Sequence, residues 1–183
     1  MKFEDYITLC LKNPEFKKYW DEEITDEENL LTTLDESAIW EVLNNSTEDD
    51  LKDIITNKGV KATVDIGTTI EFYQDRDKCP VADFLQEITD QKLKVKTLRN
   101  IKQLAIQGSN ATYPLIDYIE HGIYELRSIQ NSNLTRIFYF FVVGNKAILT
   151  NGYIKKSQKM NSREFRKAKK YMSEYMKRFT NKY

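Results

Sequence analysis

The run Ile-Phe-Tyr-Phe-Phe-Val-Val at residues 137–143 is the feature that most restricts how this chain can fold. Its residues are apolar at successive positions, so a strand formed here needs cover on both faces. It is the longest apolar run in the chain, yet it is far shorter than the roughly 20 residues needed to span a bilayer. The sequence therefore predicts a central buried strand and no membrane span.

Strand patterns lie on both sides of this run. We expect strands over 122–128, 134–143 and 146–154, and Gly144-Asn145 supplies a tight hairpin turn between the last two. An earlier strand is expected at 69–73. The alternation at 60–66 indicates one more strand, and the pattern leaves open whether it joins the sheet.

Helical spacing separates and follows these strands. Pro80 begins one helix, and a second helix ends at Gly108. Asn161 and Glu164 form a capping-box-like start to a last helix. The order β-α-α-β-β-β-α after residue 66 predicts an α+β domain, with helices on one face of a mostly antiparallel sheet.

The first 65 residues have a different character. Helical periods begin near Phe3 and at Pro14, and Asp26 and Thr47 can cap two more helices, the last ending at Gly59. This stretch holds seven lysines and no arginine against 17 acidic residues, a net charge of −10. We therefore divide the chain into a small acidic helical extension at 1–65 and a domain at 66–183.

Positive charge gathers in that domain. Residues 66–183 carry 21 basic and 11 acidic residues, a net charge of +10. Residues 155–183 alone hold 11 basic residues against two glutamates. Such a cluster attracts polyanions, although a solvated helix face has the same composition.

The counts of histidine and cysteine narrow the chemistry. His121 is the single histidine of the chain, which excludes chemistry built on a histidine pair, and with only Cys10 and Cys79 beside it a structural zinc site is improbable. We expect no metal and no cofactor, so any catalysis must use Lys, Arg, Tyr, Asp or Glu. Two cysteines, and the charges of Glu4 and Asp5 where a secretory signal would be apolar, predict a cytoplasmic protein.

Six short motifs carry a family resemblance over about residues 68–179. They are Glu71-Phe-Tyr, Cys79-Pro-Val-Ala-Asp-Phe-Leu, Gly122-Ile-Tyr-Glu-Leu-Arg, Thr135-Arg-Ile-Phe-Tyr-Phe-Phe, Gly152-Tyr-Ile-Lys-Lys-Ser-Gln-Lys and the closing basic helix. In this order they resemble the phage-derived, HigB-like branch of the RelE/ParE toxin superfamily. The family usually has Thr-Pro after the Lys-rich motif, where this chain has Met160-Asn161.

The resemblance implies a RelE-like fold and the toxin of a type II toxin-antitoxin system. Many relatives cut mRNA in the ribosomal A site, whereas the ParE relatives poison DNA gyrase and are not nucleases. It also implies catalytic roles for Arg127 and Arg136 near the scissile phosphate, together with Lys155, Lys156 and Lys159.

Metal-free RNA cleavage needs a base for the 2′-hydroxyl, charge stabilisation at the phosphate and an acid for the leaving group. Neighbouring lysines disfavour each other's protonated form, so the pKa of one of the three can be lowered and that lysine can act as the base. The arginines stay charged and can stabilise the phosphate. The acid would be a second lysine, Tyr153 or Tyr171. Further candidates for RNA or ribosome binding are Lys92, Lys96, Arg99, Arg163, Arg166, Lys170 and Tyr153.

Each candidate also has a purely structural interpretation. Arg127 could pair with Glu125 or a neighbouring strand, the tail lysines could be solvated charge, and the two tyrosines could be packing residues. The role of His121 is open.

The leading prediction is a ribosome-dependent endoribonuclease, an mRNA interferase whose partner is mRNA on the ribosome. The alternative is a non-enzymatic protein-binding module, either a ParE-like gyrase inhibitor or a degenerate toxin. A separate antitoxin, or the acidic segment at 1–65 acting as a fused inhibitor, would be the protein partner. A stabilising helical appendage is the other interpretation of that segment.

Overall fold

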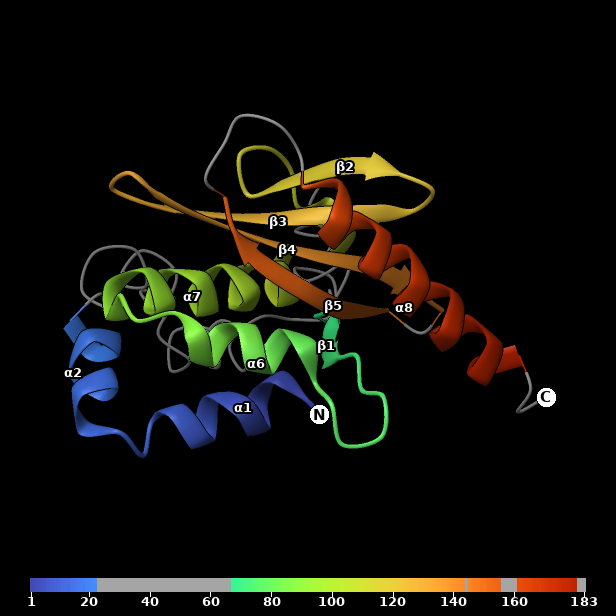
Figure 1. Ribbon diagram of the computed structural model, residues 1–183. Coiled ribbons are helices and arrows are strands. Elements are labelled where there is room, and N and C mark those ends of the chain that lie inside the picture. The colour runs from blue at the N-terminus through green and yellow to red at the C-terminus, as the bar shows by residue number, and fades with distance from the viewer. Residues whose placement is uncertain (23–66, 144, 156–160, 181–183) are drawn as a thin grey trace, which may run out of the picture. The chain divides into compact units, whose positions relative to one another are not determined.

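The computed structural model describes residues 1–22, 67–143, 145–155 and 161–180 (Figure 1). Met1–Tyr19 and the described residues from Gly67 onward belong to one compact unit. The helices expected after Asp26 and Thr47 and the strand expected at 60–66 lie outside the described residues.

Five strands form one mixed sheet with the order β1-β5-β4-β3-β2. They are β1 (Thr69–Phe72), β2 (Ile116–Glu120), β3 (Ile123–Gln130), β4 (Asn133–Val142) and β5 (Lys146–Ile154). The three pairings among β2, β3, β4 and β5 are antiparallel, whereas β1 pairs with β5 in parallel. Strand β4 is central and its residues 135–140 are buried, which confirms the prediction from the apolar run.

Strand β2 was not predicted from the sequence. It lies at the edge of the sheet, and only Ile116 is buried, while Asp117, Tyr118 and Glu120 are exposed. An edge strand with so little burial lacks the alternation of apolar and polar residues by which a strand is recognised.

The described helices are α1 (Phe3–Cys10), α2 (Pro14–Glu22), α6 (Pro80–Glu87), α7 (Gln91–Gln107) and α8 (Ser162–Thr180). Their ends follow the expected signals. Pro80 occupies the first turn of α6, where its missing N–H costs nothing. Gly108 ends α7 with φ +55°, a conformation that glycine adopts without strain.

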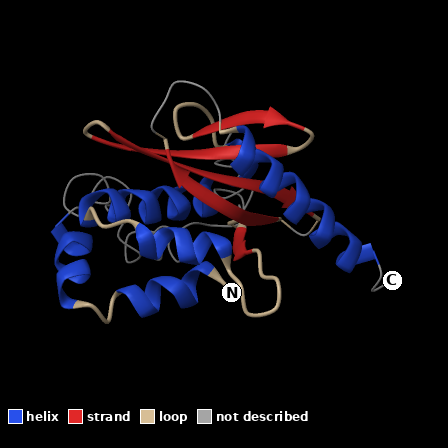
Figure 2. Cartoon of the chain, viewed as in Figure 1, coloured by secondary structure: helices blue, strands red, loops and turns tan. Residues whose placement is uncertain are grey.

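Helices cover both faces of the sheet, not one as expected from the sequence (Figure 2). On one face, Thr97 of α7 contacts Thr135 of β4 through hydroxyl oxygens 2.9 Å apart. On the other face, the ring of Phe165 in α8 lies 5.6 Å from that of Phe138 in β4. Residues 135 and 138 point to opposite faces because side chains alternate along a strand. Strand β4 has large apolar side chains on both faces, which explains why both need a helix.

Helix α1 packs against β1. The rings of Phe3 and Tyr6 lie 6.3 and 5.5 Å from that of Phe72, and the Phe72 N–H donates to the Met1 carbonyl at 2.8 Å. The first helix of the expected acidic extension is therefore part of the sheet-bearing unit. None of the described helices combines the length and apolar character that crossing a bilayer requires.

Candidate functional site

The two sheet arginines lie in one row on the face covered by α8. Arg127 of β3 is directly opposite Arg136 of β4, and Arg136 is directly opposite Tyr153 of β5. Directly opposite residues of antiparallel strands project from the same face. Strand register thus brings together three of the predicted site residues.

Arg136 is neutralised inside the protein. It is 3% exposed and forms an ion pair with Glu125, which is 4% exposed. The Tyr153 hydroxyl donates to the other oxygen of Glu125 at 3.2 Å. Burial lowers the pKa of Arg136, and the Glu125 carboxylate acts in the opposite direction. A guanidinium placed in this way has no accessible surface for a phosphate, so this arrangement differs from the expected phosphate contact.

Tyr153 belongs to the same buried group. Burial, followed by the charge of Glu125, raises the pKa of Tyr153 to about 12. Its proton is held against a carboxylate, so the hydroxyl positions Glu125 instead of facing a leaving group. The other tyrosine considered as an acid, Tyr171, is half-buried and stacks on Tyr73 with ring centroids 4.7 Å apart.

Arg127 has a different environment because it reaches the surface. Its side chain is 16% exposed, with Nη1 3.8 Å from an oxygen of Asp117. Its guanidinium carbon lies 5.0 Å from the centroid of the Tyr113 ring, and Tyr113 is 72% exposed. The Asp117 contact is long and the Asp117 side chain is half exposed, so the contact is weak and can be displaced. The pair of Arg127 and Tyr113 thus offers a cation and an aromatic ring side by side.

Lys155 follows β5 at the same end of the sheet. Its N–H donates to the carbonyl of Leu134, near the start of β4, at 2.7 Å, and its side chain is half-buried. Lys156 and Lys159 lie outside the described residues. Of the five expected catalytic cations, the structure therefore describes three and places only Arg127 and Lys155 where solvent reaches them.

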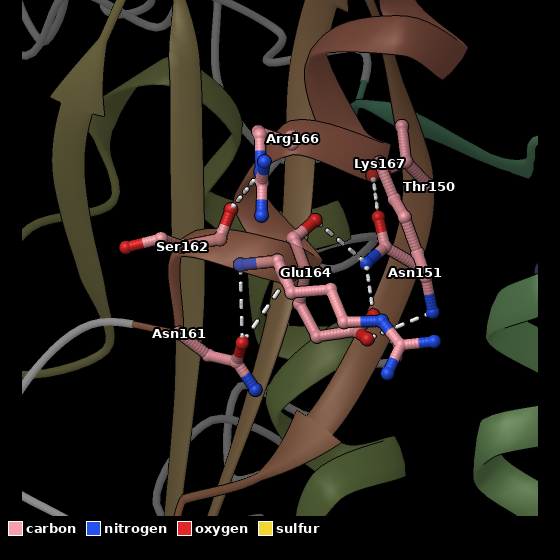
Figure 3. Close-up of polar contacts among 8 residues, drawn as sticks. Thr150, Asn151, Asn161, Ser162, Glu164, Arg166 and Lys167 are labelled. Atoms are coloured by element: carbon pink, nitrogen blue, oxygen red, sulfur yellow. Dashed lines mark hydrogen bonds and ion pairs between the residues drawn. The ribbon is translucent and has the colours of Figure 1, made fainter.

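Side-chain contacts fix the first turn of α8 on β5 (Figure 3). The Asn161 side-chain oxygen accepts from the N–H groups of Arg163 and Glu164 at 3.2 and 3.3 Å, which confirms Asn161 as the cap but not the reciprocal role expected for Glu164 in a capping box. The Glu164 carboxylate accepts from the Asn151 amide at 3.0 Å and pairs with Lys167 at 2.8 Å. Glu164 thus anchors the helix to the sheet.

The predicted binding residues fall on two different faces. Arg163, Arg166 and Lys170 are exposed on α8 at spacings of three and four, so they form one basic helix face. Lys92, Lys96 and Arg99 belong to α7, which packs on the other face of the sheet. The α7 cations therefore do not form one surface with the α8 cations or with the Arg127–Arg136 row, which lies on the α8 side of the sheet.

The sequence analysis missed two residues of this site, Tyr113 and Asp117, and did not pair a third, Glu125, with its partner. Glu125 was considered as a partner of Arg127, but the structure pairs it with Arg136. Its position two residues before Arg127 was a usable signal, because residues two apart share a strand face. Nothing in the sequence pattern marks Tyr113 or Asp117. His121 is exposed in the turn between β2 and β3, with φ +54°.

The architecture defines the class of this protein first. It is an α+β domain in which helices flank a five-stranded mixed sheet, consistent with a RelE-like fold. The family model "Phage derived protein Gp49-like (DUF891)" matches residues 83–173, from within α6 to the middle of α8. Residues 83–173 of the chain are thus similar to a Gp49-like phage-derived protein. The comparison with curated proteins gives no match.

Proposed function

We propose that this protein is a RelE-like toxin that acts on RNA, with Arg127 as its phosphate contact. One observation carries the proposal: the Arg127 side chain is partly exposed, and its guanidinium lies over the exposed ring of Tyr113. An arginine can hold a phosphate in a charge-assisted hydrogen bond, and an exposed aromatic ring can stack on an unpaired base. The Gp49-like match supports the toxin-like class.

The proposed substrate is mRNA on the ribosome, and the proposed reaction is metal-free cleavage. A lysine among Lys155, Lys156 and Lys159 removes the proton of the 2′-hydroxyl, whose oxygen attacks the phosphorus. The 5′-oxygen leaves with a proton from an acid, and a 2′,3′-cyclic phosphate remains. Arg127 stabilises the charge on the phosphate, and the basic face of α8 contacts the RNA backbone.

In this proposal Arg136 is a positioning residue. Together with Glu125 and Tyr153 it ties β3, β4 and β5 together beneath the site, so it holds Arg127 in place without touching RNA. This positioning role makes a distinct prediction. Apolar side chains that pack in place of the whole ion pair should also hold the strands together, so RNA affinity should stay intact.

The test compares the full chain with Arg127→Ala and with the double variant Glu125→Leu/Arg136→Met. Binding of a labelled single-stranded 12-mer RNA is measured by fluorescence anisotropy, and mRNA ends are mapped after induction in bacteria. We expect Arg127→Ala to weaken binding about 10- to 100-fold, from the loss of one charged hydrogen bond. The double variant should bind within about threefold of the parent. Unchanged binding by Arg127→Ala would contradict the proposal.

A second candidate is a non-enzymatic binding module, either ParE-like or a degenerate toxin. The neutralisation of Arg136 by Glu125 favours it, because one of the two expected phosphate contacts is occupied within the protein. This candidate predicts unchanged mRNA ends after induction. Inhibition of gyrase supercoiling by the purified chain would then identify the ParE-like form.

The protein partner is proposed to be a separate antitoxin or the chain's own acidic segment. In the second case, a full-length variant with Glu27, Glu28 and Asp35 changed to Gln, Gln and Asn should bind RNA more tightly. RNA affinity is measured at high salt, because salt screens the long-range repulsion between the acidic segment and RNA. Equal affinity there would argue against a fused inhibitor.

A further inference from the structure

A cavity of about 480 Å³ lies between α6, the end of β5 and the start of α8. Its lining includes Asp83 and Glu87 of α6, Gly152 and Ile154 of β5, and the paired Glu164 and Lys167 of α8. Neither Arg127 nor Tyr113 contributes to it, although Tyr153, whose hydroxyl donates to Glu125 beneath the Arg127 surface, is part of the lining.

One wall of this cavity is a free strand edge. Strand β1 pairs only with residues Lys146–Leu149 of β5, and among the described residues no other strand pairs with that side of β5. Because the Lys155 N–H donates inward to β4, the alternation of an antiparallel ladder turns the N–H and C=O groups of Gly152 and Ile154 outward. Both residues line the cavity. Unpaired backbone groups of this kind are a template for an added strand.

The charge of the lining decides which extended segment fits. Asp83 and Glu87 are one helical turn apart on α6 and both are exposed. Neither carboxylate has an ion-pair partner within the described part of the chain, whereas Glu164 is already paired with Lys167. Two free carboxylates repel an RNA backbone and attract a lysine or arginine side chain.

A metal ion is a poorer match to this lining. Within the residues that the structure describes, no three His, Cys, Asp or Glu side chains are grouped as a metal site requires. The combination of an outward-facing strand edge and two separate carboxylates is instead that of a peptide site, in which main-chain bonds give affinity and side-chain pockets give specificity.

We propose that this cavity binds an extended basic segment of a partner protein, which adds a strand beside Gly152 and Ile154 and places a Lys or Arg side chain between Asp83 and Glu87. The inference goes beyond the proposed action on RNA and does not depend on it. In this arrangement the protein holds RNA at Arg127 on β3 and a protein partner at the side of β5 that faces away from β4.

The test uses the full chain labelled with ¹⁵N and two synthetic hexapeptides, an alternating Val-Lys peptide and an alternating Val-Glu peptide. We expect the Val-Lys peptide to shift the amide signals of Gly152 and Ile154 and the Val-Glu peptide to leave them unchanged. The double variant Asp83→Asn/Glu87→Gln should weaken Val-Lys binding about five- to tenfold. The matched control Asp5→Asn/Glu15→Gln, which removes two exposed carboxylates on α1 and α2, should leave affinity unchanged.

A second variant tests the strand edge itself. Ile154→Pro removes an outward N–H without touching the bonds to β4, and proline is tolerated on such an edge. We expect it to abolish peptide binding while the thermal unfolding midpoint stays within a few degrees of the parent.

Three outcomes would overturn the proposal. They are peptide shifts confined to other residues, equal affinity of the Asp83→Asn/Glu87→Gln variant, or single-stranded RNA that shifts Gly152 and Ile154 in preference to the Val-Lys peptide. Arg127→Ala keeps this result distinct from the proposed function, because it should lower RNA affinity and leave peptide affinity unchanged.

Discussion

Breaking the buried ion pair between Glu125 and Arg136 should destabilise the fold more than most single substitutions. Glu125→Leu leaves the Arg136 guanidinium buried without a counter-charge, since the arginine is only 3% exposed. Removing one partner of a buried pair typically costs about 3–5 kcal/mol, which is a large part of a total stability of about 5–15 kcal/mol. We therefore expect Glu125→Leu to lose about 3–5 kcal/mol of unfolding free energy.

The double variant separates this cost from ordinary loss of packing. In Glu125→Leu/Arg136→Met both charges are gone, and replacing a buried pair by apolar side chains of similar size is often neutral or stabilising. The unfolding free energy of the double variant should therefore lie within about 1–2 kcal/mol of that of the parent. This loss is far smaller than the sum of the losses in the two single variants.

The double-mutant cycle consists of the parent, Glu125→Leu, Arg136→Met and the double variant. The unfolding free energy of each is measured by urea unfolding followed by far-ultraviolet circular dichroism. An interaction free energy of about 3 kcal/mol or more is expected between the two positions. Additive single and double variants would refute the reasoning, because they would show that the two charges do not depend on each other. A cost below about 1 kcal/mol for Glu125→Leu would also refute it, since that value is typical of an exposed pair.

Three further changes test other parts of the structure. The pKa of Tyr153 is raised from 10.0 to about 12 in the folded protein, so its stabilising effect is complete below pH 10 and is lost as pH rises to 12. Between pH 10 and pH 12, Tyr153→Phe should therefore lose less unfolding free energy than the parent, by up to about 2.7 kcal/mol, as measured by urea unfolding. Gly152→Ala should destabilise by about 1–3 kcal/mol, because the new Cβ would lie 2.2 Å from the Phe84 ring; adding Phe84→Leu should recover part of that loss. Asn161→Ala should cost about 1 kcal/mol through the lost cap of α8, and Asn161→Asp should keep the parent's urea midpoint. A stability difference between Tyr153→Phe and the parent that does not change from pH 10 to pH 12 would count against the Tyr153–Glu125 contact. Unchanged stability of Gly152→Ala would count against the close approach of Phe84, and an equal loss in both Asn161 variants would count against the cap.

Local signals in the sequence were enough to predict most of the elements. Pro80, Gly108 and Asn161 act within one turn of their own positions, so the ends of α6, α7 and α8 could be predicted from neighbouring residues alone. The apolar run similarly predicted β4, because seven successive apolar residues can be buried in few ways. Strand β2 could not be predicted, because its stability comes from pairing with β3 and not from its own pattern.

The candidate site depended on strand register, which no local pattern specifies. By itself the sequence determined an α+β chain with a central buried strand, a capped basic last helix and two sheet arginines. The tertiary structure decided that these arginines have different roles, because pairing of β3 with β4 places Glu125 against Arg136 and leaves Arg127 beside Tyr113. It also brought helices to both faces and left one edge of β5, at Gly152 and Ile154, without a strand partner among the described residues. These features join residues far apart in the chain, so packing and register determine them, whereas short-range propensity does not.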